Sequence, residues 1–503
     1  CLICYNKPLW RHYKMADYHE FPPAPEGTPV ANFVHLHVHS DYSLLDGASK
    51  ITTLIKRAKE LNMPALALTD HGNMFGVLNF EHICHANGIN PIVGCEFYVT
   101  ETDHKVQERT KYGGKYYHLI LLCENETGYK NMSWLCSNAY TEGLHYGKPN
   151  IDFEMLKERH EGLICLSACI QGQVPQALLH DDDEWAEEVA RKYADLFGPD
   201  HYYIELQDHG LPDQKIAAEK MIKLAEKLNL PLVVTNDIHY CNKDDAEAQD
   251  ALRCIGFKRL LDEPHQTMGD GRTEWYFKTE EEMRRLFPNH PEAYENTIKI
   301  ANMCNLTIHQ YTTPELKGCL PRFELPKEFQ RHKDYSQNQD DFVRHLVEKG
   351  LRQRYKEITP EIRERAEYEL AIIFKMGFSG YFLIVWEFIN WSKEHGIPIG
   401  PGRGSGAGSL VAYCMTITDI DPFRFNLIFE RFLNPERVSM PDFDIDMDFD
   451  YRQTIIQHTR ELYGDPQVGH IVTFGTLKPK QCIADVGRVL GIPLSEVNML
   501  KAC

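Results

Sequence analysis

Residues 441–446 read Pro-Asp-Phe-Asp-Ile-Asp, and they follow a glycine-rich stretch at 400–409, Gly-Pro-Gly-Arg-Gly-Ser-Gly-Ala-Gly-Ser. Because side chains alternate along a strand, the aspartates of the first stretch share one face: Asp442, Asp444 and Asp446. Neighbouring carboxylates repel each other unless cations lie between them, so this face predicts Mg²⁺ binding. The apolar residues of the other face indicate a strand packed on a core: Phe443, Ile445 and Met447.

The glycine-rich stretch predicts a phosphate-binding turn between a strand at Gly396–Gly400 and a helix at Ser405–Met415. Glycine lets the backbone approach a phosphate closely, and a helix N-terminus offers unpaired N–H groups. On its own, such a turn more often marks a tight bend, and neither a P-loop lysine nor a Rossmann pattern accompanies it. Together with the carboxylate strand it favours nucleotidyl transfer with two metal ions.

The length, composition and charge of the chain limit the classes of protein to which it can belong. The chain has 503 residues and no uninterrupted apolar stretch long enough to span a bilayer. No signal peptide is recognisable near the first residue, so we expect a cytoplasmic protein without a membrane partner. The fifteen cysteines are scattered, which argues against a disulfide framework. A net charge of −19 argues against nucleic-acid binding, but metal sites consume carboxylates and bound cations reverse the local field.

Residues 1–31 are expected to form an irregular, proline-containing extension. Cys1-Leu-Ile-Cys4 is a CxxC without a second pair at zinc-finger spacing, so we do not assign it a metal. Met15 is a candidate for the true start of the natural protein, which the intact mass would test.

From Phe33 onward, β-rich apolar runs alternate with amphipathic runs such as Ser49–Leu61 and Glu184–Leu196. This alternation predicts a parallel sheet or a closed β/α barrel, with its chemistry at the C-terminal ends of the strands. The expected strands are Phe33–His39, Ala65–Thr69, Pro91–Thr100, Tyr117–Leu122, Gly162–Ser167, Tyr202–Leu206 and Leu230–Asn236.

Metal-binding side chains recur on or next to these strands. The nine donors are His37, His39, Asp46, His71, Glu96, His118, Cys169, Asp237 and His239. Imidazole and carboxylate ligands together suit zinc, manganese or iron, and so many donors indicate more than one ion. Single residues here also have structural explanations, because the donor Cys169 can be a buried thiol, and Asp70, which is not one of the nine, can cap a helix beside His71. We treat His35 as a satisfied structural histidine.

Three segments resemble the motifs of the polymerase and histidinol phosphatase (PHP) family: His37–Gly47, Thr69–Gly72 and Asp237–His239. The resemblance implies a distorted seven-stranded β/α barrel that binds up to three metals, Zn²⁺ or Mn²⁺, through the nine donors. All nine match, so it also implies 3′–5′ exonuclease or phosphoesterase chemistry.

The character of the sequence changes after about residue 300, as at a domain boundary. Helices are expected at Glu361–Met376 and Phe382–Glu394. Four further segments resemble the palm of the C-family of bacterial replicative DNA polymerases: Gly400–Ser405, Phe429–Arg437, Ser439–Asp444 and Ile471–Thr476.

This second resemblance implies an α+β palm similar to the polymerase-β nucleotidyltransferase fold. It implies Asp442 and Asp444 as catalytic, Mg²⁺-binding residues, whereas Asp446 is not one of the family's catalytic trio. The residues it places near the incoming triphosphate are Arg403, Gly404, Ser405, Arg431 and Arg437. The expected domains are an extension at 1–31, a PHP domain at 32–300, a palm at 301–473 and the start of a thumb at 474–503.

The family's third catalytic aspartate has no match here. The later candidates are Asp448, Asp450, Asp465 and Asp485, and none of them stands in a matching context. We therefore expect a fragment whose third aspartate lies beyond Cys503. The implied partners are primer–template DNA and deoxynucleoside triphosphates, with the sliding clamp and other replisome subunits contacting the absent C-terminal part.

Two other functions stay open at this point. The PHP site can be the only active site of the fragment, as a metal-dependent phosphoesterase or exonuclease. Alternatively, the chain can be a non-catalytic scaffold with vestigial sites, which a complete ligand set disfavours. The sequence leaves open whether the PHP site proofreads, which metals bind, and whether the parent is the main replicase or an error-prone paralogue.

Overall fold

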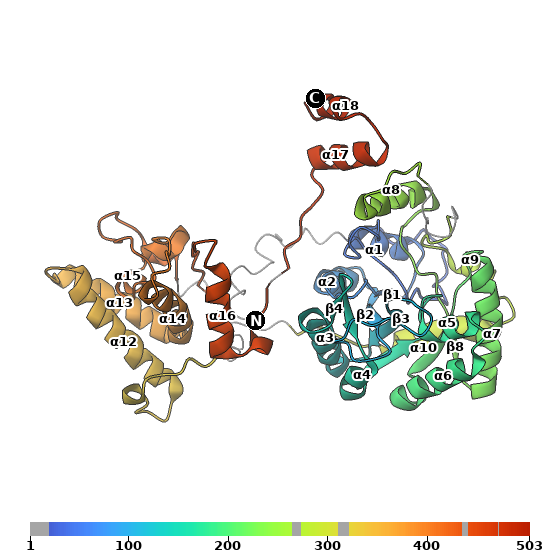
Figure 1. The fold of residues 1–503 in the computed structure, drawn as a ribbon, viewed down its shortest axis with the longest axis horizontal. Coiled ribbons are helices and arrows are strands. Elements are labelled where there is room, and N and C mark those ends of the chain that lie inside the picture. Colours follow the sequence, from blue (N-terminus) through green and yellow to red (C-terminus); the bar gives the residue numbers. More distant parts are fainter. Residues whose placement is uncertain (1–19, 264–272, 310–320, 435–440, 471, 503) are drawn as a thin grey trace. The chain divides into compact units, whose positions relative to one another are not determined.

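The computed structural model describes residues 20–263, 273–309, 321–434, 441–470 and 472–502 (Figure 1). The chain folds into two compact units. The larger, which we call the barrel unit, spans Ala16–Ile308 together with Gly475–Cys503. The smaller, which we call the helical unit, contains His309–Phe474. The candidate CxxC at Cys1–Cys4 and the candidate start at Met15 lie outside the described residues.

The barrel unit is built on an eight-stranded sheet with the order β4-β5-β2-β3-β6-β7-β8, in which β1 also pairs with β2. Every expected strand after the first is present to within a few residues. The strands are β1 (Ala65–Leu68), β2 (Asn90–Val99), β3 (Tyr117–Cys123), β4 (Leu144–His145), β5 (Lys148–Ile151), β6 (Leu163–Leu166), β7 (Tyr202–Leu206) and β8 (Leu232–Val234).

The sheet is mixed, whereas strand–helix alternation predicts parallel strands. β3 runs antiparallel to both of its neighbours, β2 and β6. A hairpin of β4 and β5, which the sequence analysis missed, adds to the far part of β2. The first part of β2 pairs with β1 and its later part pairs with β3 and β5, so one long strand serves two sets of neighbours.

The expected strand at Phe33–His39 is irregular, which corrects the sequence-based assignment. Side-chain hydroxyls take two of its backbone N–H groups, because Thr297 Oγ1 accepts from Val34 and Thr69 Oγ1 accepts from Val38. The segment still hydrogen-bonds on both sides, to β1 through Ala67 N and to Ile238 O through His39 N. It therefore closes a ring with β1, β2, β3, β6, β7 and β8, consistent with a distorted barrel.

Helices surround the ring of strands (Figure 1). Strands buried on both faces carry apolar residues at consecutive positions, so Leu66 and Leu68 contact the helical layer while Ala65 and Ala67 contact a second, inner cluster. The helices are α1 (Ile51–Glu60), α2 (Val77–Ala86), α3 (Glu126–Thr141), α4 (Phe153–Arg159), α5 (Gln173–Leu179), α6 (Asp183–Phe197), α7 (Pro212–Leu228), α8 (Ala246–Phe257), α9 (Glu280–Arg284) and α10 (Pro291–Met303).

Two C-terminal helices, α17 (Pro479–Val489) and α18 (Leu494–Ala502), also belong to the barrel unit. Helix α17 packs on α8 (Figure 1). Leu261 N donates to Val489 O at 2.9 Å, and Arg488 donates to Ile255 O at 3.3 Å. The end of the chain is thereby tied to the helix that follows the last barrel strand.

The helical unit contains α12 (Tyr335–Arg354), α13 (Pro360–Met376), α14 (Ser379–Glu394), α15 (Leu410–Cys414) and α16 (Arg452–Tyr463). Both helices expected before the glycine-rich stretch are confirmed, as α13 and α14. Thr359 caps the start of α13, and Gly377 is its C-cap. Among the described residues no single helix is long and apolar enough to cross a membrane. Only α13 and α14 taken together meet that criterion, and they are bent by 112° at their junction.

The expected strand at Gly396–Gly400 is replaced by two isolated antiparallel bridges, which join Ile399 to Met447 and Arg403 to Asp444. The reason is local, because the segment begins with a glycine at positive φ, Gly396, a second such glycine, Gly402, follows it, and the chain then turns into a 3₁₀ helix at Gly404–Gly408. The bridges nevertheless place the glycine-rich stretch beside the carboxylate segment, as the sequence predicts.

Candidate metal centre and phosphate site

The predicted metal ligands converge at one edge of the barrel. Eight of the nine fall into three overlapping groups whose ligand atoms lie within 4.8 Å of one another. The groups are His37, His39, Glu96 and Asp237; His39, His71 and His239; and Glu96, His118 and Cys169. Shared members join the groups, as expected for a centre that holds more than one ion.

Glu96 and Asp237 lie at the middle of the centre. Glu96 Oε2 is 2.8 Å from His37 Nε2 and 3.0 Å from His39 Nε2. Asp237 Oδ1 is 3.2 Å and 3.1 Å from the same two nitrogens. His37 and His39 point to one side because they stand two residues apart on an extended segment. Two carboxylates therefore face two imidazoles inside a fully buried shell.

Asp46, the ninth predicted ligand, lies at the rim of the same centre. Its Oδ2 atom is 3.3 Å from His71 Nε2 and 3.9 Å from His239 Nε2. Helix α8 covers it, because Gln249 donates to Asp46 Oδ1 at 3.1 Å and Arg253 Nε lies 3.3 Å from that atom. These two residues of α8 have no motif of their own, so the sequence analysis missed them.

The reversed strand β3 explains why His118 reaches the centre. Most strands contribute ligands from their C-terminal ends, but His118 lies at the start of β3. Because β3 is antiparallel to β2 and β6, its start lies at the same edge as their ends. His118 Nδ1 contacts Glu96 Oε1, and Cys169 Sγ lies 3.5 Å from the same nitrogen.

The donor set fits divalent cations. Four of its buried atoms make no hydrogen bond of good geometry within the described part of the chain: His39 Nε2, His71 Nδ1, Glu96 Oε1 and Asp237 Oδ1. Their nearest polar neighbours are other members of the donor set, since His39 Nε2 lies 3.0 Å from Glu96 Oε2 and 3.1 Å from Asp237 Oδ1. Atoms of this kind that converge from several strands have the chemistry of ligands for a divalent metal ion.

The electrostatics of the centre agree with this. Burial disfavours ionised carboxylates, but the positive charge of the surrounding histidines outweighs it and holds the pKa of Glu96 and Asp237 well below the usual range. Burial opposes protonation of His71, yet Glu96 and Asp46 raise its pKa to about 10. Burial and the neighbouring His39 lower the pKa of His239 to about 4. The ionised forms of these buried carboxylates are thus stabilised by nearby positive charge, and bound divalent ions would also supply such charge.

A second layer of side chains orients the ligands. Glu205 Oε1 lies 2.7 Å from His37 Nδ1, which fixes the ring with Nε2 toward the centre. Thr235 Oγ1 and Gln207 Nε2 both donate to the same carboxylate oxygen. One feature of the sequence could have pointed to Glu205. It is a carboxylate in the apolar strand Tyr202–Leu206, and a buried carboxylate must have a partner.

Asp70 belongs to this layer and does not cap a helix, since the next helix, α2, begins only at Val77. Its carboxylate accepts from the hydroxyls of Ser40 and Ser43, and Ser43 Oγ lies 2.9 Å from His39 Nδ1. His35, expected to be a satisfied structural histidine, makes a hydrogen bond through one ring nitrogen, while its buried Nδ1 has none within the described residues. Its Nε2 lies 2.8 Å from Lys278 O, and burial lowers its pKa to about 4.

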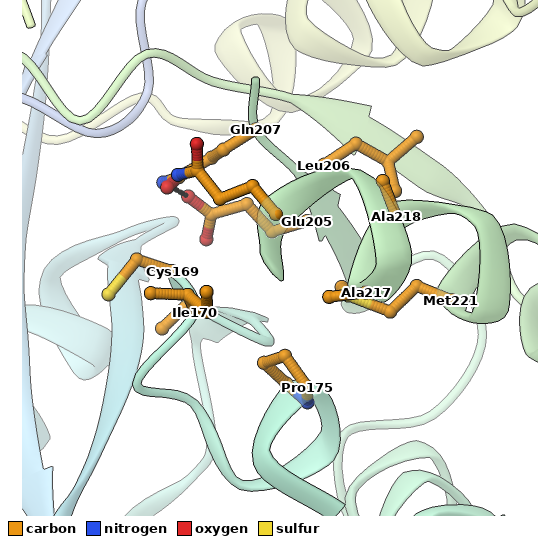
Figure 2. Close-up of a pocket in the computed structure, with 11 residues that line it drawn as sticks. Cys169, Ile170, Pro175, Glu205, Leu206, Gln207, Ala217, Ala218 and Met221 are labelled. Carbon is orange, nitrogen blue, oxygen red and sulfur yellow. Dashed lines mark hydrogen bonds between the residues drawn. The ribbon is translucent and has the colours of Figure 1, made fainter. Parts of the chain in front are cut away.

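A small cavity lies behind the centre, between β7 and helices α5 and α7 (Figure 2). Cys169, Glu205 and Gln207 line it on one side, and the hydrogen bond between the last two is visible in the figure. Its volume of about 20 Å³ is close to the space of one water molecule. The cavity is therefore too small for a substrate.

The carboxylate segment and the glycine-rich turn form the second site, in the helical unit. Gly404 has φ +70°, and a Cβ atom there would lie 2.5 Å from Asp444 Oδ2. Arg403 Nε is 3.1 Å from Asp446 Oδ1, and its Nη1 is 3.7 Å from Asp444 Oδ1. Phe443 is buried among aromatic rings, which confirms that the two faces of the segment differ.

The expected helix at Ser405–Met415 is divided, which corrects one part of the phosphate site. The 3₁₀ turn at Gly404–Gly408 comes first, and α15 begins at Leu410. The buried carboxylate of Glu369 already occupies the start of α15, where it accepts from Leu410 N and Val411 N at 3.1 Å each. The N-terminus of α15 is thus not available to a phosphate.

The other predicted residues of this site are placed as follows. Asp442 is half-buried on the carboxylate segment, and Ser405 lies exposed in the 3₁₀ turn beside Gly404. Arg431 is exposed at the end of a 3₁₀ turn, Phe429–Arg431. Arg437 lies outside the described residues. The structure therefore brings Arg403 and Gly404 to the aspartates directly.

Two family models match the chain. One, described as the PHP domain, matches residues 35–209. The other, described as the bacterial DNA polymerase III alpha NTPase domain, matches residues 341–503. The first model covers most ligands of the metal centre, and the second covers the whole carboxylate–glycine site.

Curated relatives extend over both units. The DNA polymerase III subunit alpha of Treponema pallidum is 53% identical over 469 residues, which cover 93% of this chain and 39% of that protein. The subunits of Borreliella burgdorferi and Escherichia coli K12 are 48% and 43% identical, again over 93% of this chain and over 40% and 39% of their own lengths. The chain thus spans about two fifths of these relatives. It therefore contains a PHP domain and a bacterial DNA polymerase III alpha NTPase domain, and it corresponds over 93% of its length to a portion of DNA polymerase III alpha subunits.

Proposed function

We propose that this chain is part of a DNA-directed DNA polymerase, a replicative polymerase III alpha subunit that extends primer–template DNA from deoxynucleoside triphosphates. The observation that supports the proposal is the antiparallel bridge between Arg403 and Asp444, which joins the glycine-rich turn to the carboxylate segment. In the proposal, this turn binds phosphate and the carboxylates bind metal. We assign residues 32–300 to the PHP domain, 301–473 to the palm and 474–503 to the start of the thumb.

In this proposal Asp442 and Asp444 hold Mg²⁺, which when bound activates the primer 3′-hydroxyl and neutralises the triphosphate. Gly404 lets the backbone approach because it carries no side chain against Asp444. Arg403, paired here with Asp444 and Asp446, supplies donors for the triphosphate once cations neutralise those carboxylates. No residue of this chain is assigned the role of the family's third catalytic aspartate.

The test is primer extension by a protein of the relatives' full length that contains this chain. Asp442→Ala is expected to lower extension by about a hundredfold or more, because metal ions contribute several kcal/mol to such reactions. The matched control is Asp450→Ala, an exposed aspartate shortly after the carboxylate segment, which should keep most activity. Normal extension by Asp442→Ala would refute the assigned role.

We also propose that the PHP centre hydrolyses phosphodiesters, as a 3′–5′ exonuclease, with Zn²⁺ or Mn²⁺ as its ions. The three overlapping ligand groups support this second function, since all nine predicted donors lie at the centre. When bound, the metals generate hydroxide and stabilise the charge that develops on the phosphate. His37 and His39 present Nε2 to them, and Glu205 holds the ring of His37 in place.

Metal analysis and a nuclease assay on the chain test this function. The double variant His37→Ala/His39→Ala is expected to lose its bound metal and any 3′-nuclease activity. The control is His85→Ala, since His85 is exposed on α2. Wild-type nuclease activity in the double variant would exclude the centre. The same assay separates both active proposals from a non-catalytic scaffold, which would bind no metal.

The proposed partners follow from the proposed function. They are primer–template DNA and nucleotides at the palm, and the sliding clamp and other replisome subunits through parts that this chain does not include. We propose a cytoplasmic location, where a bacterial chromosome is copied.

A further inference from the structure

An unassigned surface adjoins the metal centre on the side of β3 and the β4–β5 hairpin. It combines three aromatic and three basic side chains in two groups of contacts, which the backbone joins at Lys115-Tyr116 and through the hairpin turn from Tyr146 to Lys148. We call it the aromatic–basic track. Its residues are Tyr98, Arg109, Lys115, Tyr116, Tyr146 and Lys148.

The track is continuous with the metal ligands. The ring of Tyr116 lies 6.0 Å from that of His118, with the two planes 18° apart. Tyr98 lies beneath, 4.6 Å from Tyr116 and 6.1 Å from the ligand His71. Lys148 Nζ lies 5.0 Å above the Tyr98 ring, on the first strand residue after the hairpin turn. A molecule on this surface therefore reaches the open edge of the centre.

The outer end of the track is the turn of the hairpin. Tyr146 lies in this turn, and two cations lie over its ring. Arg109 Cζ is 5.4 Å and Lys115 Nζ is 5.3 Å from the ring centroid. Tyr146 has φ +53°, and the next residue, Gly147, has φ +75°. Two-residue hairpin turns with positive φ at both positions favour asparagine or aspartate at the first, so a tyrosine there is unusual. Backbone strain of this kind is common at functional sites.

The charges of the track have no acidic partners. Within the described residues none of Arg109, Lys115 and Lys148 takes part in an ion pair, although the chain carries 73 acidic residues against 54 lysines and arginines. Two other lysines of the same loop are paired, Lys105 with Glu142 and Lys111 with Asp182. Lys148 is partly buried and faces the carboxylates of Asp46 and Glu96, whereas Arg109 and Lys115 are exposed. The two exposed cations favour a polyanionic ligand.

We infer that the aromatic–basic track binds the single-stranded 3′ end of a DNA strand and leads it to the metal centre. The partly exposed rings of Tyr116 and Tyr146 let bases stack, and the cations follow the phosphates, which is how proteins hold single strands without reading sequence. Tyr146 and Tyr116 are the stacking residues, and Arg109, Lys115 and Lys148 contact phosphates. The inference rests on the proposed hydrolysis of phosphodiesters at the PHP centre, because it supplies that site with its substrate.

The test is binding of a fluorescent oligothymidylate of roughly ten nucleotides to the chain, with phosphorothioate 3′ linkages that resist hydrolysis. Tyr146→Ala is expected to weaken binding about tenfold, and Tyr146→Phe to restore it, because stacking requires the ring and not the hydroxyl. Lys148→Ala should lower the slope of log K against log salt by about 0.7. Lys111→Ala is the matched control, since Asp182 already pairs with Lys111. Wild-type affinity and slope in Tyr146→Ala and Lys148→Ala would overturn the inference.

Hydrolysis of bis(p-nitrophenyl) phosphate with Mn²⁺ separates this inference from the proposed function. The small diester does not reach the track, so Tyr146→Ala should hydrolyse it at the wild-type rate while cleaving oligonucleotides about tenfold less efficiently, mainly through KM. Loss of both activities in His37→Ala/His39→Ala with unchanged oligonucleotide affinity would support the track and the centre separately. A wild-type chain that hydrolyses neither substrate refutes the phosphodiesterase, whereas the affinity of the variants still decides the track.

Discussion

At the scale of single residues, Gly404 carries a conformational requirement and a steric one. Its positive φ strains any other residue, and its missing Cβ leaves room for Asp444 Oδ2 at 2.5 Å. Gly396 has nearly the same φ, +71°, with nothing within 4 Å of a Cβ. Gly404→Ala and Gly396→Ala should each cost about 1–2 kcal/mol of unfolding free energy from backbone strain. Only Gly404→Ala should also abolish primer extension in the full-length protein, and equal activity of the two variants would contradict the steric argument.

Glu205 provides a second prediction at this scale. Its carboxylate holds Nδ1 of His37, so Glu205→Gln should weaken binding of Mn²⁺ or Zn²⁺ by about 10- to 100-fold in calorimetric titration. Glu187→Gln serves as the control, because Glu187 on α6 forms an ion pair with Lys227 on α7 and contacts no ligand of the metal centre among the described residues. Unchanged metal affinity in Glu205→Gln would show that Thr235 and Gln207 alone keep the ring in place.

At the scale of elements, the start of α15 shows how a buried carboxylate replaces the phosphate that the sequence predicts there. Burial raises the pKa of Glu369, although backbone N–H groups of Val411 and Leu410 oppose the shift. A folded-state pKa above the unfolded value means that Glu369 stabilises the fold most below the unfolded pKa, and that this stability is lost as pH rises through the folded pKa. In urea titrations the stability of wild type relative to Glu369→Gln should therefore decrease as pH rises from about 4. A difference that grows with pH would contradict this assignment.

Elements also show what the sequence could predict. The ligands were predictable, because donors recur at the ends of strands with clear apolar patterns, such as His71 after β1 and Asp237 after β8. The antiparallel direction of β3 could not be predicted, since the direction of a strand depends on its partners and not on its own residues. Glu205, Gln249 and Arg253 had no spacing to mark them, because their roles depend on tertiary contacts with His37 and Asp46.

At the scale of the whole molecule, sequence order and compact units do not coincide. Helices α17 and α18 follow the helical unit in the chain but belong to the barrel unit, where α17 packs on α8. Through Gln249 and Arg253, α8 also contacts Asp46 of the metal centre. The last part of the polymerase-family domain is therefore connected to the PHP centre by a single helix.

This connection predicts that metal binding stabilises α17. A metal at a hundred times its dissociation constant adds about 2.7 kcal/mol to the unit that binds it. In hydrogen-exchange measurements, Mn²⁺ or Zn²⁺ should slow exchange of residues 479–489 together with the barrel strands, while α12–α14 of the helical unit keep their rates. Val489→Asp, which places a charge in the contact with α8, should uncouple α17 from the metal without removing the ligands. If exchange of α17 instead follows the helical unit, or ignores the metal in wild type, then α8 does not transmit the effect.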